Sequence, residues 1–344
     1  MTATDIDVGV YFDLRNPEAW RQSPSRLYGF TLEACQEAER LGASSAWFSE
    51  HHLFEDDYLT SPLTMAAAVA ARTQRMRLGT SILIAPLHHP AEIAEQSVVV
   101  DLISDGRLDL GLGTGYRVPE FELFDASLTA RYRQTDDTVR RLRHLFGPDG
   151  VRPRPVQDPV PIWLGYQGPQ GARRAGLLGA PLLTADASQW QPYSSALVEA
   201  GHPATSGVMA GAIQGWATDD PERDWPMVSK HLAHQLNSYR RHMVEGTDAP
   251  PPKPVDVDRL VGSPRSGPLG SFTYGTPEHV AEGIQAYTAG APVREIFLWA
   301  SIGGMPDDVV MRNIQTICTR LAPLLRRGST AATESPSEPL QVMS

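Results

Sequence analysis

Short apolar segments alternate with segments of helical periodicity along almost the whole chain, and this alternation constrains the fold more than any other feature. The expected strands are residues 7–12, 45–49, 76–85, 107–112, 162–164, 181–184, 208–216 and 294–299. The expected helices are residues 25–41, 62–73, 90–103, 131–146, 170–178, 221–244, 277–287 and 307–324. Repeated strand–helix units predict parallel strands joined by right-handed crossovers. About eight such units are what a closed (β/α)8 TIM barrel needs, whereas the alternative, a doubly wound open sheet, usually has fewer strands.

The chain of 344 residues shows no break in composition that would divide it, so we predict one domain over residues 1–328. Residues 247–271 are rich in proline and lack periodicity, and we expect them to form an irregular insertion or lid. Residues 329–344 are small and polar, which predicts a disordered tail.

The charge balance narrows the classes of partner. The chain has 30 Lys and Arg against 40 Asp and Glu, a net charge of −10, which disfavours nucleic acid and anionic membranes. No segment approaches 18 consecutive apolar residues, so no membrane span is expected. Two cysteines and an acidic N-terminus without an apolar signal segment indicate a reducing, cytoplasmic location.

In a (β/α)8 barrel, chemistry takes place at the carboxyl ends of the strands, so the candidate residues are those that follow each expected strand. Glu50 and His51 follow the second strand, and we predict that Glu50 orients His51 as a general base or hydrogen-bond donor. The alternative is a purely structural carboxylate–imidazole pair. The four histidines at 51, 52, 88 and 89 lack the spacing of a zinc site, so no metal is expected.

Glycine-rich segments follow the fourth and fifth strands. Residues 165–171 join a strand to a helix, where backbone N–H groups can bind a phosphate, although no P-loop sequence is present. Residues 113–115 offer a similar but shorter pattern. For both segments, tight packing within the barrel is the alternative explanation.

Five strings occur together in a recognisable order: "WFSEHH", "MRLGTSILIAPLHHPAEIAEQ", "VVDLISDGRLDLGLGTGY", "PIWLGYQGPQGARRAGLLGAPLL" and "YGTPEHVAEGI". With these strings the chain resembles the bacterial luciferase-like superfamily of flavin-dependent monooxygenases and deazaflavin-dependent oxidoreductases, over about residues 7–324. The resemblance implies a (β/α)8 barrel that binds a flavin across its carboxyl-end face.

The resemblance also assigns site residues. By position, His51 is similar to the catalytic histidine beside the flavin, and Ser81–Ile82 to a pair that often forms a non-prolyl cis peptide against the flavin ring. The phosphate-facing turn corresponds to Gly165, Tyr166, Gln167, Gly168, Gln170 and Gly171.

Three residues after the fourth strand complete the cofactor assignment: Thr114, Gly115 and Arg117. In luciferase an arginine that meets the flavin phosphate stands at the position of Thr114. Here Thr114 supplies a hydrogen bond without charge, and Arg117 is the candidate for the missing charge. FMN is therefore the first expected cofactor and F420 the second.

The resemblance implies an enzyme that oxygenates a small hydrophobic organic substrate with O2 and reduced FMN through a flavin C4a-peroxide. No NAD(P)H-binding unit is recognisable, so a separate flavin reductase is expected to supply the reduced flavin. A homodimer is also expected. The first alternative is an F420-dependent oxidoreductase that transfers hydride, and the second is a flavin-binding accessory protein without catalytic turnover.

Overall fold

The computed structural model describes residues 5–261 and 272–326. Eight parallel strands close into a barrel: β1 (Asp7–Phe12), β2 (Ser45–Phe48), β3 (Arg77–Thr80), β5 (Leu108–Gly113), β6 (Ile162–Leu164), β7 (Leu182–Leu183), β8 (Met209–Ile213) and β11 (Val293–Trp299). Closure follows from the pairing of β3 with β5 and of β1 with both β2 and β11. The predicted (β/α)8 barrel is confirmed.

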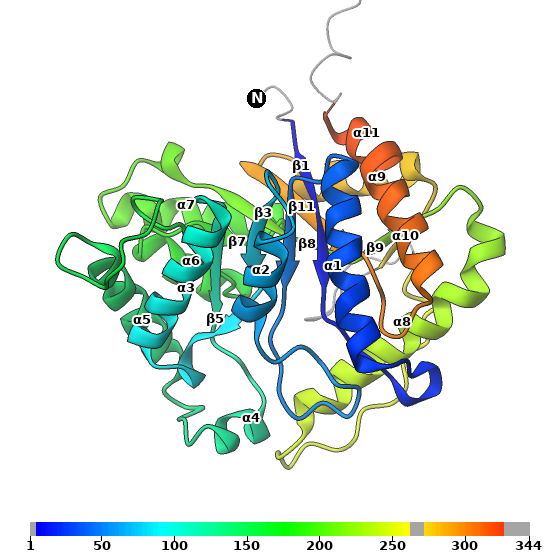
Figure 1. Cartoon of the computed structure of the whole chain (residues 1–344), viewed down its shortest axis with the longest axis horizontal. Coiled ribbons are helices and arrows are strands. Elements are labelled where there is room, and N and C mark those ends of the chain that lie inside the picture. The colour runs from blue at the N-terminus through cyan, green and yellow to red at the C-terminus, as the bar shows by residue number, and fades with distance from the viewer. Residues whose placement is uncertain (1–4, 262–271, 327–344) are drawn as a thin grey trace, which may run out of the picture.

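The helices lie outside the barrel strands (Figure 1). They are α1 (Pro24–Arg40), α2 (Pro62–Ala70), α3 (Pro90–Ser104), α4 (Val118–Leu123), α5 (Arg131–Phe146), α6 (Gly168–Leu177), α7 (Trp190–Glu199), α8 (Pro221–Val244), α9 (Pro277–Thr288), α10 (Asp307–Thr316) and α11 (Ala322–Arg326). A π-helical turn, Ile317–Leu321, joins the last two. Proline at the first turn fixes many of these starts, because its missing N–H costs nothing there.

Two predicted strands are interrupted where they reach the carboxyl end of the barrel. The strand expected over residues 76–85 divides into β3 and β4 (Leu83–Ile84), and the Ser81–Ile82 peptide between them is cis, as the resemblance implies. The strand expected over residues 208–216 divides into β8 and β9 (Gly215–Ala217), because β9 leaves the barrel to pair with β10 (Thr273–Gly275). The helices α4 and α7 and the strand β10 were not predicted.

Large aromatic side chains fill the barrel interior. Trp47 is fully buried, stacks on Phe297 at 4.7 Å between ring centroids and meets Trp163 edge-on at 6.4 Å. A Cβ atom at Gly79 would come within 2.1 Å of the Trp47 ring, so glycine is required on the neighbouring strand. The interior is therefore packed around these rings, and open space remains at the carboxyl end of the strands.

The carboxyl ends of the strands lie at the lower edge of Figure 1, where α4 and α8 cover them. Of the predicted insertion at 247–271, residues 247–261 are largely irregular, and residues 262–271 lie outside the described residues, as does the predicted tail at 329–344. No helix in the described part of the chain is long and apolar enough to cross a bilayer.

Candidate active site

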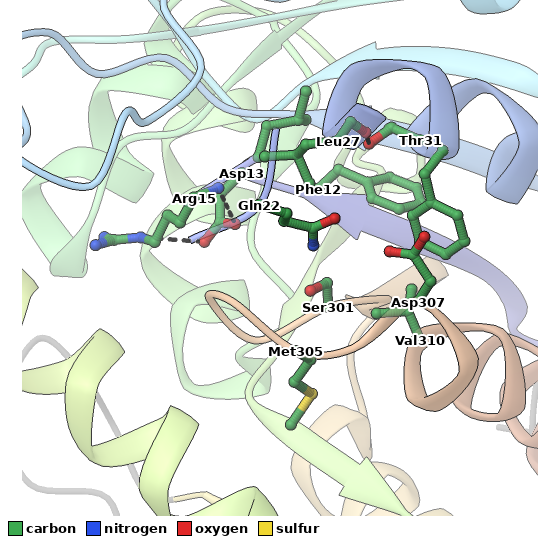
Figure 2. A pocket seen from close by; sticks show the side chains of 12 residues that line it. Phe12, Asp13, Arg15, Gln22, Leu27, Thr31, Ser301, Met305, Asp307 and Val310 are labelled. Atoms are coloured by element: carbon green, nitrogen blue, oxygen red, sulfur yellow. Dashed lines mark hydrogen bonds and ion pairs between the residues drawn. The ribbon is translucent and has the colours of Figure 1, made fainter. Parts of the chain in front are cut away.

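A cavity of about 830 Å³ occupies the carboxyl end of the barrel. Its walls come from the carboxyl ends of all eight barrel strands, and α8 adds Tyr239 and Met243. A volume of this size suits a ligand as large as a flavin or a drug-like molecule. A second cavity, between β1, α1 and α10, has a volume of about 20 Å³, which suits a single water molecule (Figure 2).

The large cavity brings together most of the predicted site residues. Those that line it are Glu50, His51, Ser81, Ile82, Thr114, Gly115, Gly165, Tyr166, Gln167 and Gly168. Three predicted residues do not line it: Arg117, Gln170 and Gly171. The site therefore assembles predicted residues from four separate strand ends, those of β2, β3, β5 and β6, as expected for a barrel of this type.

His51 is held by a carboxylate that the sequence did not reveal. Its Nδ1 lies 2.7 Å from Glu120 Oε1, and its side chain is 11% exposed, on the cavity side. Glu120 also accepts the backbone N–H of His52 at 2.9 Å. Burial opposes ionisation of Glu120, but the bonds from His51 and the His52 N–H, with Arg117 nearby, hold its pKa below the usual value. An ionised Glu120 can only accept, so His51 donates from Nδ1.

The expectation that Glu50 orients His51 is wrong. Glu50 Oε1 instead lies 3.0 Å from His52 Nε2 and 2.6 Å from His88 Nε2, and its Oε2 accepts the N–H of Ile84 at 2.5 Å. Burial would raise the pKa of the Glu50 carboxyl, but these bonds hold it below its usual value. Glu50 therefore ties the end of β2 to the segment that follows β3.

Glu50 is the shared partner of two of the four histidines, His52 and His88. Both imidazoles direct Nε2 at one carboxylate oxygen at hydrogen-bond distance. Within residues 5–261 and 272–326, no three His, Cys, Asp or Glu side chains are grouped so as to hold a metal ion.

Hydroxyl groups line the wall beside His51. Ser49 Oγ lies 2.6 Å from Tyr58 Oη, and Tyr58 Oη lies 2.8 Å from Tyr239 Oη. Tyr116 Oη approaches His51 Nε2 at 3.5 Å. Burial raises the pKa of the Tyr58, Tyr116 and Tyr239 hydroxyls, so these groups remain neutral donors at ordinary pH.

A buried cation backs this wall. The Arg15 guanidinium lies 4.6 Å from the Tyr58 ring centroid and 4.3 Å from that of Tyr239. It pairs with Asp13 and Asp56, and Figure 2 shows Arg15 pointing away from the other side chains of the small cavity. Arg15 therefore fixes the two rings from behind without reaching the large cavity.

Two further elements of the cavity wall, the starts of α5 and α6, fit an anionic group. Gly168 begins α6 with φ of +71° and lines the cavity, so the N-terminus of this helix borders it. Arg131, which begins α5, also lines the cavity, and its buried Nε has no hydrogen-bond partner. An unpaired buried donor and a helix N-terminus that line one cavity match a phosphate or carboxylate.

Other glycines in this region serve packing. A Cβ atom at Gly113 or Gly165 would lie 2.6 or 2.4 Å from the Ile82 side chain, so both glycines make room for Ile82. Gly171 is buried against Tyr166, and a Cβ atom there would lie 2.8 Å from that of Tyr166. Gln170 is exposed to solvent outside the cavity. For Gly113, Gly165 and Gly171 the structure therefore supports the alternative stated above, that these glycines permit tight packing within the barrel.

Arg117 is not positioned to supply the expected phosphate charge. Its side chain is fully buried, pairs with Glu245 at 2.5 Å and lies over the Phe54 ring at 4.5 Å. Arg131, Glu120 and Tyr239 were not among the predicted site residues. Arg131 could have been found from the sequence, because it is a cation in the segment that follows the fourth strand. No local sequence pattern marks Glu120 or Tyr239 as a site residue.

The family model described as luciferase-like monooxygenase matches residues 8–293. The chain belongs to this family. The oxygenase component of a flavin-dependent trigonelline monooxygenase from Acinetobacter baylyi is 31% identical over 165 residues, 43% of this chain and 46% of that protein. An F420-dependent glucose-6-phosphate dehydrogenase from Amycolatopsis mediterranei is 28% identical over 190 residues, 49% of this chain and 57% of that protein.

Solved structures agree with this fold. The monooxygenase RslO1 from Streptomyces bottropensis superimposes with a TM-score of 0.75 at 22% identity, covering 92% of this chain and 99% of that one. The matches to the two curated relatives above span about half of each relative's length. The predicted luciferase-like oxidoreductase is therefore confirmed at the level of family and fold, and the family includes relatives named for flavin and for F420.

Proposed function

We propose that the chain is the oxygenase of a two-component monooxygenase that uses reduced FMN and O2 to oxygenate a hydrophobic organic substrate. One observation carries the choice of FMN. Among the described residues that line the large cavity, Arg131 is the one arginine or lysine, and it lies at the same cavity as the start of α6. One cation and one helix start suit a single phosphate, whereas the tail of F420 adds several carboxylates to its phosphate.

Two groups of cavity residues would have different roles, one in binding the cofactor phosphate and the other in proton transfer. The N-terminus of α6 and Arg131 would hold the phosphate, and Ile82 and His51 would contact the rest of the cofactor. Reduced flavin, when bound, supplies the electrons that activate O2. His51 donates to Glu120 through Nδ1, and in its neutral form it would accept a proton at Nε2 from the substrate or from water.

The apolar and aromatic walls support a water-poor reaction space. Ile82, Ile84, Leu183, Ile213 and Trp299 line the cavity together with the tyrosines. Exclusion of water strengthens the hydrogen bonds made by His51 and protects reactive species from side reactions. The substrate would bind between these walls, which favours a hydrophobic molecule.

The decisive experiment compares cofactors and oxygen. Purified protein is titrated anaerobically with reduced FMN and with reduced F420, and turnover of a substrate panel is then measured with and without air and with ¹⁸O2. The proposal expects binding of FMN, product only in air, and one labelled oxygen atom in the product. Equal turnover under nitrogen with F420 supports the alternative of hydride transfer. Cofactor binding without turnover supports the accessory protein.

Arg131→Met tests the phosphate assignment. Loss of a charge-assisted hydrogen bond is expected to weaken FMN binding about 10- to 100-fold. Arg133→Met is the matched control, because Arg133 is an exposed arginine of the same helix that does not line the cavity. Equal FMN affinity in both variants places the phosphate elsewhere.

The proposal includes a separate flavin reductase and a homodimer. The relative from Acinetobacter is named as an oxygenase component, which supports the reductase. Sustained turnover when a reductase and NADH replace chemically reduced FMN tests the first, and light scattering during gel filtration tests the second.

A further inference from the structure

The end of α8 is docked on α4, the short helix that carries the carboxylate partner of His51. Glu245 follows the last residue of α8, and its Oε2 lies 2.5 Å from Arg117 Nη2. A Cβ atom at Gly246 would lie 2.8 Å from Val118 Cβ, and Gly246 has φ of +74°, so the chain approaches α4 too closely for any other residue. An ion pair and a close contact between Gly246 and the Val118 side chain thus fix this junction.

Arg117 also contacts the other side of the junction. Its Nη1 donates to the carbonyl of His52 and lies 3.4 Å from Glu120 Oε1. The same carboxylate oxygen lies 2.7 Å from His51 Nδ1. The ionisable groups therefore form a row that runs from the cavity outward: His51, Glu120, Arg117 and Glu245.

We propose that Arg117 and Glu245 are positioning residues that set the proton affinity of His51 from behind its carboxylate partner, Glu120. A lone buried carboxylate beside an imidazole favours the imidazolium form. Arg117 offsets the charge of that carboxylate, and so it weakens the attraction of Glu120 for a proton on His51. Glu245 in turn offsets part of the Arg117 charge, and because its side chain is 46% exposed, solvent screens its effect.

The other ionisable groups that face His51 do not offset the charge of Glu120. Tyr116 precedes α4, Tyr58 lies on the loop that follows β2 and Tyr239 lies on α8; all three are neutral because burial raises their pKa values. Glu50 is engaged by His52 and His88.

The remaining histidine near the junction is also neutral. Burial lowers the pKa of His242 to about 4, so it is uncharged where the enzyme is expected to work. Its Nε2 is 3.9 Å from Glu245 and 2.8 Å from Glu55. Arg117 is therefore the charged partner that Glu245 meets at hydrogen-bond distance.

The test measures the titration of His51 directly, by NMR of the full chain without cofactor, with the resonance assigned through His51→Gln. Arg117→Met is expected to raise the titration midpoint by about one pH unit. Glu245→Gln, which keeps the cation and removes its counter-charge, is expected to lower the midpoint by a few tenths of a unit. Opposite directions are the signature of charge balance, since a loosened structure would move both variants the same way.

Glu55→Gln is the matched control. Glu55 is a half-exposed carboxylate near the end of α8 that pairs with Arg241 and His242 rather than with Arg117, so the His51 midpoint should not move. Unchanged midpoints in both test variants, or shifts in the same direction, overturn the proposal. If Arg117→Met does not fold, Glu245→Gln decides alone, because an unaltered midpoint there overturns it equally.

A second measurement uses the holoenzyme and rests on the proposed function. If neutral His51 is the working base, the acid limb of the kcat profile against pH should move with the NMR midpoint in each variant. NMR shifts without a change in the profile would leave the charge balance standing and remove His51 from the reaction.

Discussion

Two carboxylate–imidazole clusters lie next to each other at the end of β2, and they differ in what they face. Glu50, with His52 and His88, forms a cluster that joins the segments after β2 and β3. His51, with Glu120 of α4, presents its ring to the cavity and to Tyr116. Residues 50–52 thus contribute both to a cluster that links two loops and to a candidate catalytic pair. The two histidines differ in role because the fold gives them different carboxylate partners.

His51→Ala is expected to have the largest effect. Loss of a general acid or base typically lowers kcat by about 10²–10⁴, and FMN binding and the unfolding midpoint should change little. Stopped-flow turnover and thermal denaturation measure the two properties. Near-normal kcat with bound flavin would assign both clusters to structure.

Glu120→Gln is expected to lower kcat about 10- to 100-fold, because the neutral amide no longer fixes the His51 tautomer through charge. Glu122→Gln, an exposed carboxylate on the same short helix, is the control and should match the parent protein. Equal rates in the two variants would show that the contact between Glu120 and His51 is structural.

Glu50→Gln is expected to act on stability, lowering the free energy of unfolding by about 1–3 kcal/mol as charge-assisted bonds are lost from a buried site. The lowered pKa of Glu50 makes its contribution present above about pH 4.3, the unfolded value, and lost as pH falls through the folded value.

The pH dependence of this effect follows from His88. Burial opposes protonation of His88, but the hydrogen bond to Glu50 and the charge of Glu50 outweigh burial and raise the pKa of His88. Its contribution is therefore complete below about pH 6.5, the unfolded value, and lost as pH rises through the raised folded value. Urea denaturation should show a larger cost of Glu50→Gln at pH 6 than at pH 9. An equal cost at both pH values would mean that His88 is not the partner that matters.

Tyr116→Phe is expected to have the smallest effect, about threefold or less in kcat, because a contact of 3.5 Å to His51 Nε2 is a weak hydrogen bond. Steady-state kinetics with the holoenzyme measures it. A tenfold or greater loss would place the Tyr116 hydroxyl within the proton-handling group.

The amino-acid sequence alone predicted the barrel and the end of the barrel at which the candidate active site lies. Alternating periodicities report which faces of each element are buried, and parallel strands must place their carboxyl ends at one edge. Helix starts marked by proline, as at Pro221 and Pro277, were likewise readable, because their physical cause is local.

The tertiary structure alone decided which groups meet. Glu50 is adjacent to His51 in the chain, yet Glu120, 69 residues away, is the carboxylate that holds it. Neighbouring residues at a strand end diverge, and their partners arrive from other elements whose distance along the chain no periodicity encodes. Arg117 illustrates the same limit: its position in a strand-end loop suggested a phosphate ligand, but the docking of α8 on α4 supplied Glu245 and enclosed the guanidinium. Long-range packing, rather than residue type, determined the role of each charge.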